Sequence, residues 1–194
     1  MELRREFENR IKVSNNKSFN NNGKYIVYWM NHSHRAYFNH SLEFAIELAN
    51  IYQKPLLVYF PITDKYRFSN VRYYKFMLDG ILEAKKAIEE RGIKLILEKV
   101  DDMKQKILEI SKSSFALILD KAYLRYYRNL HKKIADGIDI SVFEVESVNL
   151  DFGIKELTIN NSLEILNTLN INKNISISPF VGGYSNAKKY LENF

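Results

Sequence analysis

Five short apolar runs alternate along this chain with segments whose apolar residues recur at helical spacing, and this alternation constrains the fold more than any other feature. Continuous apolar runs are typical of parallel strands that are buried on both faces of a sheet. Strands separated by helices need crossover connections, which are right-handed and place helices against the sheet. The sequence therefore predicts an α/β fold: a Rossmann-like five-stranded parallel sheet with helices on both faces. The expected strands are residues 25–30, 56–60, 93–97, 115–119 and 140–145.

The helical segments carry signals for where a helix begins or ends. The first helix is expected within residues 35–52, and the last within residues 124–134. Ser69 or Asn70 can cap the second helix, because their side chains can accept a hydrogen bond from the first turn. Gly92 suits its end, since glycine readily adopts a positive φ. These signals place a helix between consecutive strands, as a parallel sheet requires.

The Asn-rich composition of the N-terminal segment predicts a flexible tail over residues 1–24. Residues 14–24 contain too few apolar side chains to offset the entropy lost on ordering them. We expect the residues before Lys24 to pack little against the sheet. The α/β domain is expected over residues 25–150, and the remainder, residues 151–194, is expected to be a linker-like appendage.

The composition excludes several kinds of site. Without cysteine, the chain cannot form a disulfide, a thiolate metal site or a thiol nucleophile. No apolar stretch approaches the roughly 18–20 residues that span a bilayer, and the first residues lack the apolar core of a secretory signal. We therefore expect a soluble, cytoplasmic protein without membrane contact. The net charge of +6 attracts nucleic acid only mildly, so DNA binding by this chain alone is expected to be weak or absent.

Several residues that follow the expected strands, most of them polar, lie where an open parallel sheet binds its ligands. The first strand is followed by NHSHR rather than by a glycine-rich loop, and no P-loop motif occurs, so NAD and P-loop nucleotide chemistry are disfavoured. We expect the candidates to converge at this edge and to contact a bound cofactor. They are Met30, Arg35, Asn39, Asp120, Arg125, Glu146 and Asn149.

Asp120 directly follows a buried strand and has two interpretations. Its carboxylate could accept hydrogen bonds from a bound ring, or it could cap the following helix. His32, His34 and His40 are close in sequence, but their spacing matches no standard ligand pattern, and no metal site is expected. His131 stands alone in a Lys-rich helix and is expected to be exposed.

Several motifs together resemble class II cyclobutane-dimer photolyases. YWMNHSHRAYFNHSLEFAIELAN (residues 28–50) is similar to the opening of that family, and KPLLVYF (54–60) to its second strand. RYYKFMLDGILE (72–83) resembles its long FML-x-G-L-x-E helix, and VESVN (145–149) the end of its fifth strand. FVGGYSNAKKYLENF (180–194) resembles the element that leads into the catalytic domain. The resemblance thus covers the chain, but only the N-terminal part of a photolyase.

The resemblance implies the α/β antenna domain of a DNA-repair lyase without the helical domain that binds FAD. It implies an antenna pigment (a deazaflavin, folate or flavin) at the carboxyl edge and no FAD in this chain. It also implies a separate flavin-binding helical domain as partner, docked near residues 179–194. His32 and Ser33 replace an Arg-Asp pair of many class II members, leaving Arg35 as the matching charge. We expect no catalytic residue and no photorepair by this chain alone.

Two other functions fit the same fold. The chain could be a regulatory module that binds a small ligand or a nucleotide, or it could be an interaction subunit of a split photolyase. A pigment that absorbs beyond the tryptophan and tyrosine bands would favour the antenna function. Binding of adenine nucleotides would favour the regulatory module.

Overall fold

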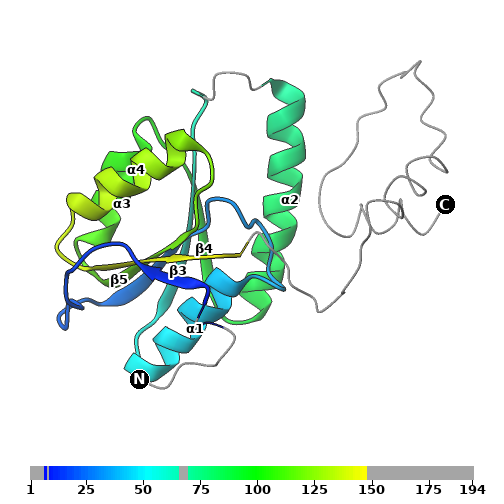
Figure 1. Cartoon of the computed structure of the whole chain (residues 1–194). Coiled ribbons are helices and arrows are strands. Elements are labelled where there is room, and N and C mark those ends of the chain that lie inside the picture. The colour runs from blue at the N-terminus through cyan, green and yellow to red at the C-terminus, as the bar shows by residue number, and fades with distance from the viewer. Residues whose placement is uncertain (1–6, 8, 66–69, 148–194) are drawn as a thin grey trace, which may run out of the picture.

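The computed structural model describes residue 7, residues 9–65 and residues 70–147. Within them, four helices cover one sheet of six strands (Figure 1). The strands are β1 (Ile11–Val13), β2 (Tyr25–Trp29), β3 (Leu56–Ile62), β4 (Lys94–Lys99), β5 (Ser114–Asp120) and β6 (Ser141–Val145). The helices are α1 (His40–Tyr52), α2 (Val71–Glu90), α3 (Met103–Ser111) and α4 (Arg125–Asp136).

The strand order is β1-β6-β5-β2-β3-β4. From β2 the chain proceeds outward through β3 and β4, then returns to the other side of β2 to form β5 and β6; these five strands are parallel. The order therefore reverses between β2 and β5, which is the topological switch point where open α/β sheets bind ligands. The predicted α/β fold with five parallel strands is confirmed.

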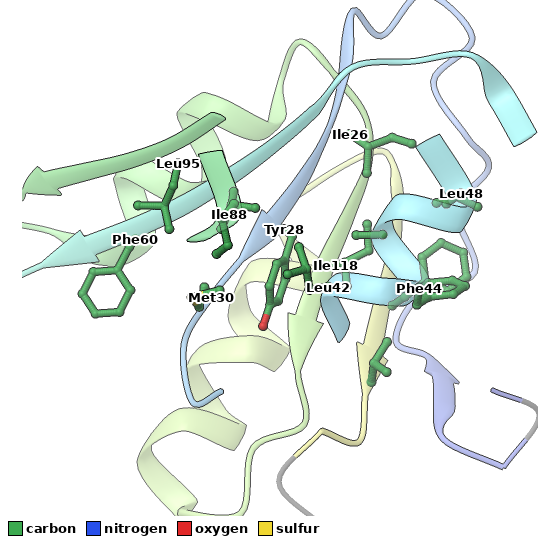
Figure 2. Close-up of a cluster of buried hydrophobic side chains, with 14 of the residues drawn as sticks. Ile26, Tyr28, Met30, Leu42, Phe44, Leu48, Phe60, Ile88, Leu95 and Ile118 are labelled. Atoms are coloured by element: carbon green, nitrogen blue, oxygen red, sulfur yellow. The ribbon is translucent and has the colours of Figure 1, made fainter. Parts of the chain in front are cut away.

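Alternate residues of the central strand β2 pack against different pairs of helices. Ile26, Tyr28 and Met30 belong to a buried cluster with side chains of α1 and α2 (Figure 2). Val27 and Trp29 belong to a second cluster with side chains of α3 and α4, which lie on the other side of the sheet (Figure 1). Successive strand residues point to opposite faces, so only an unbroken apolar run can serve both layers. Each large side chain buried in this way contributes about 1.5–3 kcal/mol.

The N-terminal segment is part of the domain, and the prediction of a flexible tail over residues 1–24 is wrong for the residues described. β1 pairs antiparallel with β6, with Ile11 opposite Val145. Phe7 is fully buried, and its ring lies 5.9 Å from that of Phe44 in an edge-to-face arrangement. The sheet therefore has six strands rather than the five predicted, and the added edge strand is antiparallel.

Asparagine side chains explain why this polar segment is ordered. Asn15 Oδ1 accepts a hydrogen bond from the backbone N–H of Val142 at 3.1 Å. Its Nδ2 donates to the carbonyl oxygens of Ala135 and Ile140 at 3.2 and 2.9 Å. Apolar burial alone does not account for the order of this segment, because amide hydrogen bonds to neighbouring backbone hold much of it in place.

The helix ends follow the capping signals closely. Asn39 begins α1 and accepts a hydrogen bond from the Leu42 N–H at 3.0 Å, so the helix starts later than the predicted range. Of the two predicted caps of α2, Asn70 accepts from the Tyr73 N–H at 3.0 Å. Gly92 follows α2 with a φ of 77°, as expected for a helix terminator. Among the described helices, none is both long and apolar enough to cross a membrane.

Candidate functional site at the carboxyl edge of the sheet

Asp120, the last residue of β5, lies at the switch point and holds the loop that follows β2. Its Oδ2 accepts hydrogen bonds from the backbone N–H groups of Asn31, His32 and Ser33 at 3.0, 2.8 and 3.0 Å. Its Oδ1 accepts from the Tyr28 hydroxyl at 2.8 Å. The carboxylate is fully buried, and these charge-assisted bonds offset its desolvation. Asp120 thus neither caps α4 nor faces an open site: it binds the chain's own amides.

A buried polar cluster continues from Tyr28 to the start of α1. Burial, together with the nearby Asp120 carboxylate, raises the pKa of Tyr28 well above its usual value, so its hydroxyl stays protonated. The hydroxyl accepts a hydrogen bond from Asn39 Nδ2 at 3.1 Å. Ser147 Oγ accepts from the Ser41 N–H at 2.6 Å and donates to Asn39 Oδ1 at 3.2 Å. The cluster therefore joins β2, β5 and α1 to the segment after β6.

Arg35 fixes the outer part of the loop between β2 and α1. Its Nε donates to the Phe38 carbonyl at 3.0 Å, and its guanidinium also donates to the carbonyl of Ser147. Phe38 has a φ of 53°, which bulky residues rarely adopt, and its side chain is 68% exposed. Tyr37 is exposed beside it in sequence. Arg35 thus holds a loop that presents two aromatic rings to solvent.

The loop between β5 and α4 and the first turn of α4 present a second set of exposed side chains. Tyr123, Leu124 and Tyr126 are large apolar or aromatic residues that remain exposed. Arg125 opens α4 and is exposed; within the described part of the chain, its guanidinium has no hydrogen-bond or ion-pair partner. The first turn of α4 has neither an acidic residue nor a side-chain cap, so its free N–H groups favour an anion.

Glu146 follows β6 and is almost fully buried. Its Oε2 lies 3.1 Å from Lys121 Nζ and accepts a hydrogen bond from the Tyr123 hydroxyl. Met30 is fully buried in the cluster beneath α1 and α2. Asn149 and the predicted appendage, residues 151–194, lie outside the described residues.

The predicted site residues therefore separate into a framework and a rim. The structure joins Asn39, Asp120 and Arg35 through the buried cluster and the loop that Asp120 clamps. Arg125 opens α4, and Glu146 follows β6 and bonds to Lys121 and Tyr123 in the loop between β5 and α4. Among the predicted site residues that the structure describes, Arg35 and Arg125 are the two that are not buried, so they form the rim.

Sequence reasoning missed Tyr28, Ser41 and Ser147 and misjudged His131. Predicted to be exposed, His131 is 1% exposed and lies on the sheet-facing side of α4 with Ile134. His131 is three residues from Ile134, and this spacing places both on one face of a helix. The neighbouring lysines favoured the prediction of an exposed helix instead. No local sequence pattern predicts the roles of the Tyr28, Ser41 and Ser147 hydroxyl groups, since they bond to partners that are distant in sequence.

A cavity of about 950 Å³ lies at the opposite edge of the sheet. It is bounded by residues 18–22 and by the ends of α3 and α4, and it contains none of the predicted site residues. Within the described residues there is also no group of three or more His, Cys, Asp or Glu side chains that could hold a metal ion.

A family model described as DNA photolyase matches residues 26–161. This chain belongs to the DNA photolyase family. Deoxyribodipyrimidine photo-lyase of Methanothermobacter thermautotrophicus is 36% identical to it over 138 residues, which are 71% of this chain and 31% of that relative. The present chain thus spans less than a third of the length of this relative.

The solved structure of one photolyase agrees with the family at the level of the fold. A bacterial class III photolyase from Agrobacterium tumefaciens has a TM-score of 0.50 at 16% identity, over 63% of this chain and 26% of that one. A universal stress protein from Archaeoglobus fulgidus in complex with dAMP has a TM-score of 0.46 at 12% identity, over 64% of this chain and 99% of that one. The match to the class III photolyase shows the α/β fold alone, and the class II resemblance stays a prediction.

Proposed function

We propose that this chain is the antenna domain of a photolyase, of the class II type, and that it holds a pigment at the carboxyl edge of its sheet without repairing DNA itself. A deazaflavin, folate or flavin bound there would supply light absorption and pass the excitation to a flavin in another domain. The family and the α/β fold support this function. In this proposal, Met30, Asn39, Asp120 and Glu146 support the site from within.

The observation that carries the proposal is that exposed aromatic side chains lie beside the two rim residues, Arg35 and Arg125, at the switch point. Tyr37 and Phe38 are exposed on one flanking loop, which Arg35 holds in place. Tyr126 and Arg125 are exposed on α4, which follows the other flanking strand. Aromatic rings stack on flat chromophores, and guanidinium groups pair with carboxylate or phosphate. These side chains therefore suit a planar pigment that carries negative charge.

We assign FAD binding and repair to a separate helical domain. The chain spans only 31% of the curated photolyase. Trp29 is its single tryptophan and is buried in the core, so it cannot provide a chain of electron-relay tryptophans. The net charge of +6 supports only weak DNA binding by the chain alone.

The test measures absorption beyond the protein band after the purified chain is mixed with a deazaflavin, a folate or FMN and then gel-filtered. We expect one pigment to be retained, and we expect Phe38→Ala and Arg125→Ala each to weaken its binding about tenfold, or about 1.4 kcal/mol. Leu82→Ala and Lys86→Ala, exposed changes on α2, are the matched controls. Retention of none of the three pigments, or equal losses in the controls, would contradict the proposal.

A second function, as the interaction subunit of a split photolyase, fits the same family and fold. Light-dependent repair of a dimer-containing oligonucleotide distinguishes the two roles. We expect no turnover by this chain with reduced flavin, and turnover only after a helical-domain polypeptide is added. Repair by this chain alone would overturn the assignment of catalysis to another domain. Binding of adenine nucleotides in place of any pigment would instead support a regulatory module.

A further inference from the structure

The side chain of Asn31 lies between two histidine rings at the carboxyl edge. Its Nδ2 is 3.1 Å from Nε2 of His32 and 3.3 Å from Nε2 of His131. An amide NH₂ group has two hydrogens and donates only, so it can serve one ring with each hydrogen. In this arrangement, both Nε2 atoms are acceptors and carry no proton.

The second nitrogen of His131 defines its tautomer. Nδ1 lies 3.1 Å from Glu144 Oε1, and His131 is 1% exposed. The hydrogen bond from His131 lowers the pKa of Glu144, so the carboxylate is ionised and can only accept. Nδ1 therefore carries the proton, and neutral His131 is the Nδ1–H tautomer.

A proton added to His131 would place an Nε2–H bond against the N–H bond of Asn31. A half-turn of the Asn31 amide replaces Nδ2 with Oδ1, whose two lone pairs can accept from both rings. The Nε2 atom of His32 then faces an acceptor, so the neutral ring of His32 favours the tautomer with its proton on Nε2. Protonation of buried His131 thereby changes which ring nitrogen of half-buried His32 donates a hydrogen bond.

We propose that Asn31 is a positioning residue that relays the protonation of buried His131 to His32 at the carboxyl edge. The backbone need not move, because Asp120 holds the N–H groups of Asn31 and His32 at 3.0 and 2.8 Å in either amide orientation. This relay is a property of the loop and does not depend on the proposed pigment.

Charged and titratable groups from several strands, α4 and the adjoining loops surround the two histidine rings. Glu144 is joined by Lys12 at 4.0 Å, and the ring of Tyr127 lies 4.9 Å from that of His32. Burial lowers the pKa of His32; Asp120 opposes this effect, and His131 and His34 add to it. The charged or titratable groups facing the two rings are Lys12 on β1, Asp120 on β5, Lys121 and Tyr127 before and on α4, Glu144 on β6 and His34 in the loop.

The experiment is a titration of the ¹⁵N-labelled full chain by NMR, following the ring nitrogens of both histidines from about pH 8 to about pH 5. We expect the nitrogens of His32 and His131 to change together with one shared midpoint. Asn31→Ala should separate them into two midpoints, whereas Asn129→Ala, an exposed change on α4, should not. Independent titrations in the unmodified chain, or a shared midpoint that persists in Asn31→Ala, would overturn the relay.

A second variant tests the direction of the relay without altering Asn31. Glu144→Gln removes the ionised acceptor that fixes Nδ1 as the protonated nitrogen of His131, so the ring-nitrogen signals of both histidines should change together relative to the unmodified chain. A change at His131 with none at His32 would show that the rings are not coupled and would contradict the proposal.

Discussion

At the scale of single residues, the carboxyl edge depends on Asp120 more than on any rim residue. Its buried carboxylate accepts three consecutive backbone N–H groups and the Tyr28 hydroxyl. A buried donor that loses its partner costs about 1–3 kcal/mol. The loop that carries Arg35 and Phe38 is therefore shaped by a residue that a ligand need not touch.

Asp120→Ala should lower the free energy of unfolding by about 3–5 kcal/mol, because it leaves three N–H groups and one hydroxyl without their acceptor. Urea denaturation at neutral pH measures the loss. Asp139→Ala is the control: this exposed carboxylate pairs with Lys17 at 2.7 Å, and its removal should cost less than about 1 kcal/mol. Similar losses in the two variants would show that Asp120 does not anchor the loop.

Phe38→Gly should leave the free energy of unfolding unchanged or raise it by up to about 1 kcal/mol. Glycine adopts a positive φ without the clash that a Cβ causes, and the exposed ring contributes little burial. Phe38→Ala keeps the strained φ and should show no gain, which thermal denaturation of both variants can establish. A loss above about 1 kcal/mol in the glycine variant would mean that packing of the ring contributes to the stability of the fold.

At the scale of elements, β1 and the segment after it close the β6 side of the sheet. β1 is only three residues long, and the side chain of Asn15 extends its contacts by bonding to Val142, Ala135 and Ile140. Short, twisted or covered edges limit unwanted pairing between sheets of different molecules. The Asn-rich segment thus protects an edge as well as ordering the N-terminus.

Asn15→Ala should destabilise the domain by about 2–3 kcal/mol, since it removes three partly buried hydrogen bonds. Hydrogen exchange should report faster exchange of the β6 amides, with little change in β3 and β4 at the far side of the sheet. Asn16→Ala, an exposed neighbour, should change neither quantity by more than about 0.5 kcal/mol. Unchanged β6 protection in Asn15→Ala would contradict the role given to this segment.

At the scale of the whole molecule, the two faces of the sheet are apolar cores, and most of the buried polar groups lie at the carboxyl edge, among them Asn39, Asp120 and Ser147. His32, Glu98 and Glu144 are partly buried and have lowered pKa values, so the stability of the folded state should depend on pH. Burial lowers the pKa of His32 below 6.5, and hydrogen bonds lower the pKa values of Glu98 and Glu144 below 4.5.

The free energy of unfolding should be highest near neutral pH and fall in two stages on acidification. Below pH 6.5 the unfolded chain binds a proton at His32 more readily than the folded chain does, so stability declines. Below pH 4.5 protonation of Glu98 and Glu144 removes the stabilisation that their ionised forms supply. Urea denaturation at a series of pH values measures both stages, and His32→Gln should flatten only the first. An unchanged first stage in that variant would assign it to other groups.

The sequence by itself determined the layers of this protein. The apolar runs specified five parallel strands, because a strand buried on both faces must be apolar throughout, and the caps Asn39 and Asn70 act within a few residues of their own position. Local rules suffice for such features. They also sufficed to place Arg35 and Arg125 at the carboxyl edge, since that edge follows from strand direction.

Only the tertiary structure decided which of these residues can meet a ligand and which support the fold. Asp120 and the loop it clamps are 87–89 positions apart in sequence, and Asn15 and Val142 are 127 apart, so no local pattern reveals these pairs. The same polar side chain can cap a helix, bind a ligand or hold a distant backbone, and the choice depends on which donors the folded chain brings within hydrogen-bond distance. That long-range pairing ordered the N-terminal segment, buried His131 and placed Asn31 between two histidines.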